Sequence, residues 1–167
     1  FGPWGSTPCL WMNCNGQRFM NESFAGLVLA QSCRQPINPE AKMVGNFAIM
    51  DSKYMSYIQA GGLDHGAPNW GFPEGIEEFQ AQMAAADPAA GTVEVRGLEI
   101  ANRTSPFVNE IFVGATLEDA LKNAGLEGEA LENAKASVER YNELCAAGKD
   151  TDFGKPENLL IPIDEGP

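Results

Sequence analysis

The sequence is poor in residues that bind metals. It contains a single histidine, His65, and four cysteines, at positions 9, 14, 33 and 145, which form no CxxC pair. Structural zinc sites draw their Cys and His ligands from closely spaced pairs. A metal centre is therefore not expected, and the cysteines are interpreted as isolated thiols rather than as a redox pair.

Basic residues are also scarce. Eleven Lys and Arg residues stand against 23 Asp and Glu residues, which gives a net charge of −12. Such a surface repels nucleic-acid phosphates and anionic membranes, so neither is expected as a partner. No apolar run approaches the ~20 residues that a membrane-spanning helix needs.

The first eight residues, FGPWGSTP, lack an initiator methionine and the basic and apolar regions of a signal peptide. The sequence therefore looks trimmed, and the cellular location stays open. Hydrophobic residues make up 44% of the 167 positions. This length and composition predict one folded domain, residues 1–167, with a real core.

The most informative stretch is residues 10–22, LWMNCNGQRFMNE. Asn15-Gly16 separates two runs, and both residues accept the positive φ of a type I′ turn, which predicts a β-hairpin. The second run and its exit carry a cationic, an aromatic, an amide and an acidic side chain, those of Arg18, Phe19, Asn21 and Glu22. A plain alternative is that Arg18 pairs with an acid such as Glu22 and only locks the hairpin exit.

Periodicity predicts the other elements. Apolar or alternating runs predict strands at residues 46–51, 92–96, 98–101 and 110–113. Helical spacing predicts helices at residues 23–31, 74–86, 116–124 and 129–147. Thr116 is expected to cap its helix, with Asp119 at the capping-box position. The sequence therefore predicts an α+β fold with an N-terminal hairpin, a small mixed sheet and C-terminal helices.

Two blocks of the sequence resemble a known family. The first is the pattern of Asn13, Gly16, Arg18-Phe19 and Asn21-Glu22. The second consists of Thr116-Leu117-Glu118, Val138-Glu139-Arg140-Tyr141-Asn142, Gly148, Asp150, Asp152-Phe153-Gly154 and Pro162. Together they are similar to the capping domain of FAD-dependent oxidoreductases of the fumarate reductase and succinate dehydrogenase flavoprotein family, above all to its soluble bacterial members.

The resemblance implies a substrate-capping domain without its FAD-binding domain. The sequence has no GxGxxG motif after a predicted strand, which the dinucleotide-binding domain of such an enzyme would carry. FAD and a small-molecule substrate are implied for the full-length protein, with the FAD-binding domain of the same polypeptide as partner. The fragment alone is expected to bind little FAD. Residues that bind the cofactor or orient the cap are implied at Arg18, Phe19, Asn21 and Glu22.

One departure from the family pattern concerns the substrate. Fumarate reductases carry an Arg-Asp pair a few residues after Asn-Glu, and the Arg donates the proton. This sequence has Gly26-Leu27 there, and the next arginine is Arg34. A neutral or aromatic substrate is therefore expected instead of a dicarboxylate. The candidate proton donors are Arg34, Tyr54, Tyr57 or a group outside this sequence.

Two other interpretations stay open. The chain could be a stand-alone, non-enzymatic ligand-binding module. It could also be the cap of a steroid-dehydrogenase-like flavoenzyme, which would need a more apolar pocket.

Overall fold

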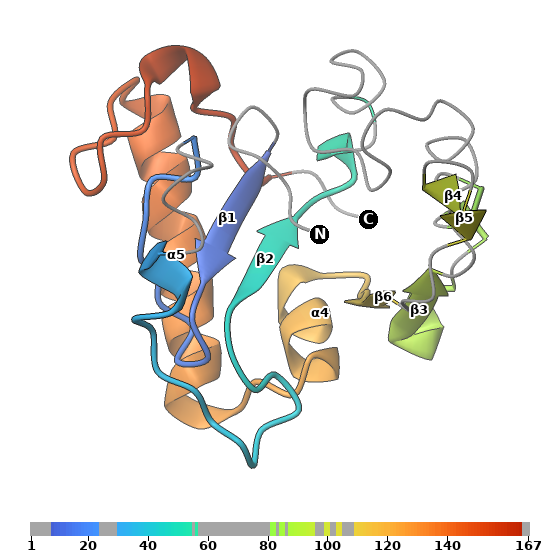
Figure 1. Ribbon diagram of the computed structural model, residues 1–167. Coiled ribbons are helices and arrows are strands. Elements are labelled where there is room, and N and C mark those ends of the chain that lie inside the picture. Colours follow the sequence, from blue (N-terminus) through green and yellow to red (C-terminus); the bar gives the residue numbers. More distant parts are fainter. Residues whose placement is uncertain are drawn as a thin grey trace.

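The computed structural model describes residues 8–23, 30–54, 56, 81–82, 84–85, 87–95, 99–100, 103–104 and 109–164. These residues form an α+β fold, as the sequence predicts (Figure 1). The described strands make three separate antiparallel pairs rather than one mixed sheet. The pairs are β1 (Cys9–Met12) with β2 (Phe47–Met50), β3 (Thr92–Val95) with β6 (Asn109–Phe112), and β4 (Glu99–Ile100) with β5 (Arg103–Thr104).

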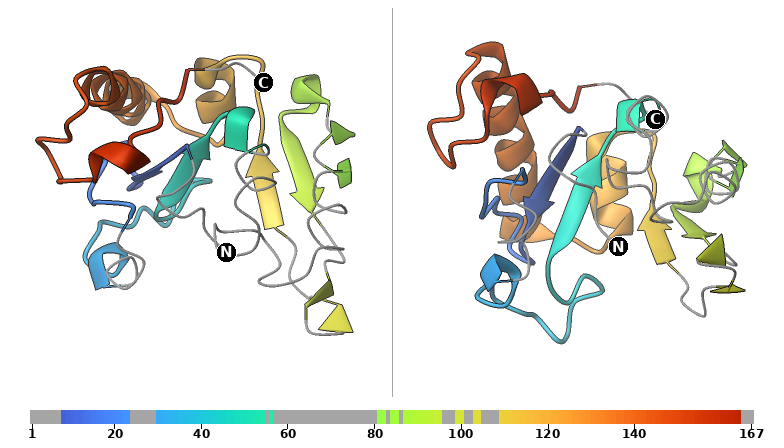
Figure 2. Two further views of the ribbon diagram at one scale, coloured as in Figure 1. Left: turned by 90° about the horizontal axis from the view of Figure 1, so that it is seen from above. Right: turned by 45° about the horizontal axis from the view of Figure 1, so that its top comes forward.

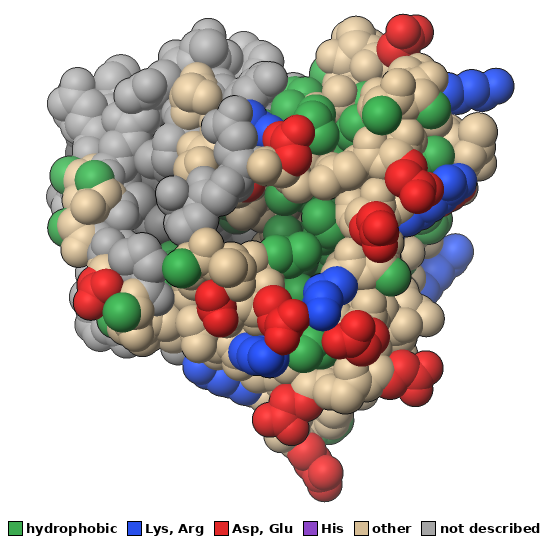
Figure 3. All heavy atoms as spheres, turned by 180° about the vertical axis from the view of Figure 1, so that it is seen from behind, with side chains coloured by type: hydrophobic (Ala, Val, Ile, Leu, Met, Phe, Trp, Pro, Cys, Tyr) green, Lys and Arg blue, Asp and Glu red, His purple; other side chains and the backbone are tan. Residues whose placement is uncertain are grey.

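Two helices cover one face of the β1–β2 pair (Figure 2). They are α4 (Leu117–Asn123) and α5 (Gly128–Ala146). Short 3-10 helices occupy Pro88–Ala90 and Glu157–Leu159. On the opposite side of the molecule from Figure 1, acidic side chains lie beside Lys and Arg side chains (Figure 3).

Local signals correctly predict how α4 begins and ends. The backbone N–H of Asp119 donates to the Thr116 hydroxyl, at 3.1 Å, which confirms the predicted N-cap. The Thr116 hydroxyl in turn donates to the Asp119 carboxylate. Gly125 follows the helix with φ of +85°, a conformation that glycine adopts without a steric penalty.

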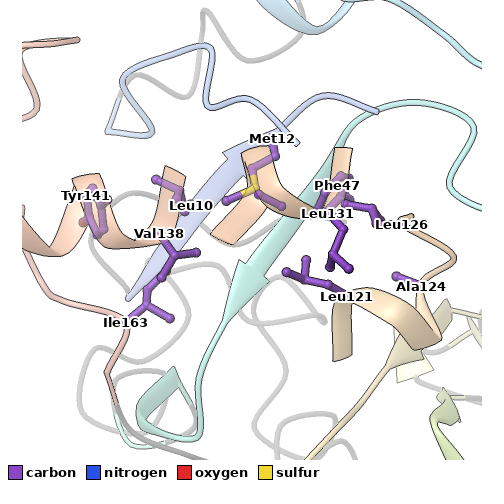
Figure 4. Close-up of a cluster of buried hydrophobic side chains, with 11 residues drawn as sticks. Leu10, Met12, Phe47, Leu121, Ala124, Leu126, Leu131, Val138, Tyr141 and Ile163 are labelled. Atoms are coloured by element: carbon purple, nitrogen blue, oxygen red, sulfur yellow. The ribbon is translucent and has the colours of Figure 1, made fainter. Parts of the chain in front are cut away.

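Helix α5 presents one apolar stripe to the core, as its residue spacing predicts. The buried members of the stripe are Leu131, Ala134, Val138, Tyr141 and Leu144. All of them except Leu144 belong to one core cluster with Leu10 and Met12 of β1, Phe47 of β2 and Leu121 of α4 (Figure 4). Because helix and strands each bury one face here, the core lies between the two layers.

The hairpin prediction is wrong in its details. The N–H of Gly16 donates to the carbonyl of Asn13, so Cys14 and Asn15 stand at the centre of the turn. The Asn13 side chain moves the turn by one residue, because its Oδ1 accepts from the N–H groups of Asn15 and Gln17.

The second strand of the hairpin, predicted at residues 17–21, does not form, although these residues are all described. One isolated bridge joins Met12 to Arg18, and β1 pairs over its whole length with β2 instead. After Arg18 the backbone makes no further bridge to β1, and the Arg18 side chain forms a buried ion pair with Glu22.

Several predictions fall wholly or partly outside the described residues. They include Tyr57, Gly26-Leu27 and most of the helices predicted at residues 23–31 and 74–86. Within the described part of the chain, no helix is long and apolar enough to cross a membrane. No three His, Cys, Asp or Glu side chains among those residues are placed to hold a metal ion.

Candidate functional site

Arg18 and Glu22 form a two-pronged ion pair inside the protein. Nε of Arg18 donates to Oε1 of Glu22 and Nη2 donates to Oε2, each at 2.8 Å. The exposed fraction is 6% for the Arg18 side chain and zero for that of Glu22. Paired hydrogen bonds of this kind fix both the distance and the angle between the two groups.

Asp150 connects this pair to the C-terminal part of the chain. Its Oδ2 accepts from Nη2 of Arg18 at 2.8 Å, and its side chain is fully buried. The N–H groups of Asp152, Phe153 and Lys155 also donate to this carboxylate, each at 3.0 Å. One carboxylate therefore folds the loop of residues 150–155 around itself and binds Arg18 at the same time.

The pKa values follow from these contacts. Burial by itself would raise the pKa of Asp150, but the N–H of Phe153 and the Arg18 guanidinium outweigh it and lower the pKa to about 2. Burial would likewise lower the pKa of Arg18, yet hydrogen bonds and charge from Glu22 and Asp150 raise it above its usual value. Both groups are therefore charged across the physiological pH range.

Two aromatic rings enclose the Arg18 guanidinium. Its carbon lies 5.0 Å from the centre of the Tyr141 ring and 4.9 Å from that of Phe153. Both distances are within the range of cation–π attraction. Tyr141 comes from α5, so the rings hold Arg18 between the helix and the loop.

Lys155 completes the cluster and balances its charge. The fully buried ammonium donates to the Tyr141 hydroxyl at 2.8 Å and lies 3.7 Å from Oε2 of Glu22. Two cations, Arg18 and Lys155, thus face two carboxylates, Glu22 and Asp150. Removing any one member of such a buried cluster is expected to destabilise the protein, because the charge of its partner would be left unpaired.

The structure brings together some of the predicted site residues and separates others. Arg18, Glu22 and Asn21 lie against the C-terminal loop, and the Asn21 amide donates to the carbonyl of Gly154 at 2.9 Å. Phe19 is partly buried and lines a small cavity of about 200 Å³ next to Phe153. Its side chain takes no part in the ion cluster.

The structure describes two of the three predicted proton donors, Arg34 and Tyr54. Arg34 is exposed, just after the helical residues 30–32. Tyr54 is buried, 2% exposed, and burial raises the pKa of its hydroxyl. Tyr57 lies outside the described residues. Their role as proton donors stays a prediction.

The sequence correctly offered Glu22 as an ion-pair partner of Arg18, but sequence reasoning missed the other partners. Asp150, Tyr141 and Phe153 belong to the second motif block, but nothing in the pattern pairs them with the first. Lys155 stands outside both blocks. The sequence offers one signal that could have found them. Both blocks carry charged residues at motif positions, which indicates that a residue of one block could pair with an opposite charge in the other.

A larger cavity opens beside the cluster. Its volume is about 430 Å³, and its walls come from Gln17-Arg18, one face of α5 and Asp152-Phe153. The α5 face contributes polar side chains such as Asn133 and Ser137 and the apolar Leu144. The cavity is therefore lined by both polar and apolar side chains rather than by apolar ones alone.

Comparison with known proteins gives one informative result. No protein-family model matches the sequence. Over 98% of its length, the chain is 27% identical to a vinyl phenol reductase of Lactiplantibacillus plantarum. The chain spans 28% of that relative's length. It is thus similar, almost from end to end, to a part of a reductase.

Proposed function

We propose that this chain is the substrate-capping domain of an FAD-dependent oxidoreductase that moves a hydride between flavin and an activated carbon–carbon bond. The observation that carries the proposal is the similarity to a reductase over nearly the whole chain. The motif blocks that resemble flavoprotein caps support the same assignment. Because the chain matches only 28% of the relative, the remaining catalytic parts belong to other portions of the full-length protein.

The described residues do not fit FAD as a direct ligand. Phosphate groups need N–H donors of a Gly-rich loop or cations with open positions. Nε and Nη2 of Arg18 are already bound by Glu22 and Asp150, Nη1 is buried, and the sequence has no GxGxxG motif after a predicted strand. We therefore assign Arg18, Asn21 and Glu22 to shaping the cap, and the FAD to another domain of the same polypeptide.

The proposed role of the ion cluster is to keep the cap in one shape. It ties the segment that begins the cap to the loop that follows its longest helix. Holding these two segments in one arrangement would help to place the reacting groups, and such placement contributes strongly to enzymatic rates.

The proposed substrate is a neutral, aromatic alkene. The relative's name denotes a vinyl phenol, which carries no carboxylate. The family's Arg-Asp pair is replaced by Gly26-Leu27, which removes a cation and a proton donor. Binding a dicarboxylate needs several fixed cationic side chains with free hydrogen-bond donors, and the sequence has few basic residues.

Steady-state kinetics of the full-length protein test this proposal. With a reduced dye as electron donor, we expect turnover of 4-vinylphenol and little turnover of fumarate. Losing a general acid typically slows a reaction by about 10²–10⁴-fold. Fumarate turnover on the order of 10 s⁻¹ would contradict the proposal. If that activity disappeared in Arg34→Ala, Arg34 would be the missing acid.

A binding measurement tests whether FAD is bound by another domain rather than by this chain. FAD titrated into the 167-residue chain should show no tight, stoichiometric complex by fluorescence, whereas the full-length protein should hold FAD. A reading frame that continues into a Gly-rich dinucleotide-binding domain is expected. Tight binding of FAD to the 167-residue chain would contradict the assignment of FAD to another domain.

A further inference from the structure

We propose that the 430 Å³ cavity beside Arg18 binds a small, neutral aromatic carboxamide. This site is independent of the reaction proposed above. It is a depression that is open to solvent on one side, and its volume is within the ~300–1,000 Å³ typical of small-molecule sites. Three separate segments of the chain build its walls, so the fold has to be complete before the site exists.

The first argument is an unused hydrogen-bond donor. Glu22 occupies Nε and one side of Nη2 of Arg18, and Asp150 occupies the other side of Nη2. Nη1 is buried and has no hydrogen-bond partner among the described residues. A buried donor without an acceptor costs free energy, so a ligand that brings an acceptor to Nη1 gains binding free energy.

The second argument concerns the charge of the ligand. Both arginines of the cavity wall are already neutralised: Arg18 by Glu22 and Asp150, and Arg140 by Asp152 and Glu143. An additional anion would find both arginine charges already balanced by these carboxylates, one of which, Asp152, lies in the cavity wall. A cation would meet the donor face of Arg18. A neutral acceptor such as a carbonyl oxygen avoids both penalties.

The third argument concerns the shape and the second hydrogen bond. Phe153 is 39% exposed, rests on the guanidinium, and lines this cavity and the smaller one. In the proposed complex this ring moves aside so that the ligand reaches Nη1, and it offers an aromatic surface for stacking. Gln17 is exposed, and no hydrogen bond of its side chain amide to the described residues is found. A carboxamide can give its oxygen to Arg18 and its N–H to Gln17.

Three probes of nearly equal shape but different charge show how the charge of the ligand affects binding. Benzamide is neutral, benzoate is anionic, and benzamidinium is cationic and has no acceptor. Binding is followed by NMR chemical shifts of the ¹⁵N-labelled 167-residue chain. We expect benzamide to shift Gln17, Asn133 and Phe153 with a dissociation constant on the order of 1 mM, as suits so small a ligand. Benzoate and benzamidinium should bind at least about tenfold more weakly.

Two variants and one control locate the site. Ala136 is exposed on the cavity wall, so Ala136→Leu should fill the cavity without harming the fold and weaken benzamide binding about tenfold or more. Phe153→Leu should weaken it about three- to tenfold through loss of stacking. Glu139 is exposed on α5 but away from the cavity wall, so Glu139→Leu should leave binding unchanged.

Each other outcome would overturn the proposal. Tightest binding of benzoate would make this an anion site, and tightest binding of benzamidinium would mean attraction to the acidic surface. Unchanged benzamide binding in Ala136→Leu would place the ligand elsewhere. An absence of shifts at about 10 mM benzamide, ten times the expected dissociation constant, would show that the cavity binds no carboxamide.

Discussion

Arg18 and Asp150 lie 132 positions apart in the sequence and are joined by a hydrogen bond of 2.8 Å in the interior. The contact links the two blocks of motif residues, one near each end of the chain. Because Glu22, Tyr141, Phe153 and Lys155 all touch the same guanidinium or its partners, the contact is the centre of a cluster. This dependence on several partners makes the cluster testable by single substitutions.

Asp150→Asn should destabilise the protein strongly. The substitution keeps the size of the side chain but places an NH₂ group where Arg18 and the Lys155 N–H need an acceptor. Breaking a buried ion pair in this way typically lowers the free energy of unfolding by about 3–5 kcal/mol. Urea denaturation measures the change. Asp152→Asn is the control, because its pair with Arg140 is solvent-exposed and should matter much less.

The stability contributed by Asp150 should disappear in acid. Its pKa of about 2 in the folded protein lies below the usual value of about 3.9. The unfolded chain therefore takes up the proton first, and the contribution is fully present above pH ~5 and lost as the pH falls toward 2. The expected loss is on the order of 2 kcal/mol, read from denaturation midpoints between pH 5 and 2.

Glu118 is another acid whose titration at low pH needs a control. Hydrogen bonds from Lys122 and Lys135 lower the pKa of Glu118 to about 2, but this group is exposed. High salt should screen its contribution while leaving that of buried Asp150 largely intact. A pH dependence that is the same in wild type and Asp150→Asn would contradict the assignment to Asp150.

Gly16→Ala should be harmful for two reasons at once. Gly16 has φ of +74°, and a Cβ atom there would overlap the backbone oxygen of Ala130 in α5. Gly154 has φ of +71° but open space around the position of a Cβ. Gly154→Ala should therefore lose only about 1 kcal/mol from the backbone conformation, and Gly16→Ala clearly more. Equal thermal midpoints for the two variants would mean that α5 does not pack on the turn.

Leu144→Ala should test the buried stripe of α5. Leu144 is 3% exposed, so its truncation should lower the free energy of unfolding by about 2–5 kcal/mol. Glu139 lies on the exposed face of the same helix, and Glu139→Ala should change stability little. An unchanged denaturation midpoint for Leu144→Ala would show that this side chain is not part of the core.

The ends and faces of the helices could be predicted from the sequence. Helix α5, the cap at Thr116 and the stop at Gly125 follow from side chains within four residues of one another, and such local preferences act wherever the segment lies. The strand β2 was likewise visible as a short apolar run. The α+β class follows from these local elements taken together.

The partners of those elements were decided by the tertiary structure. Strand β1 pairs with β2, 35 or more residues away, because both bury an apolar face against the same helices. The Asn13 side chain displaced the expected turn, which a dipeptide rule cannot foresee. The sequence marks Arg18 and Glu22 as notable, but it does not name Asp150, Tyr141 or Lys155 as their partners. A buried charge must find its counter-charge in space, and only the folded chain determines which residue is near enough.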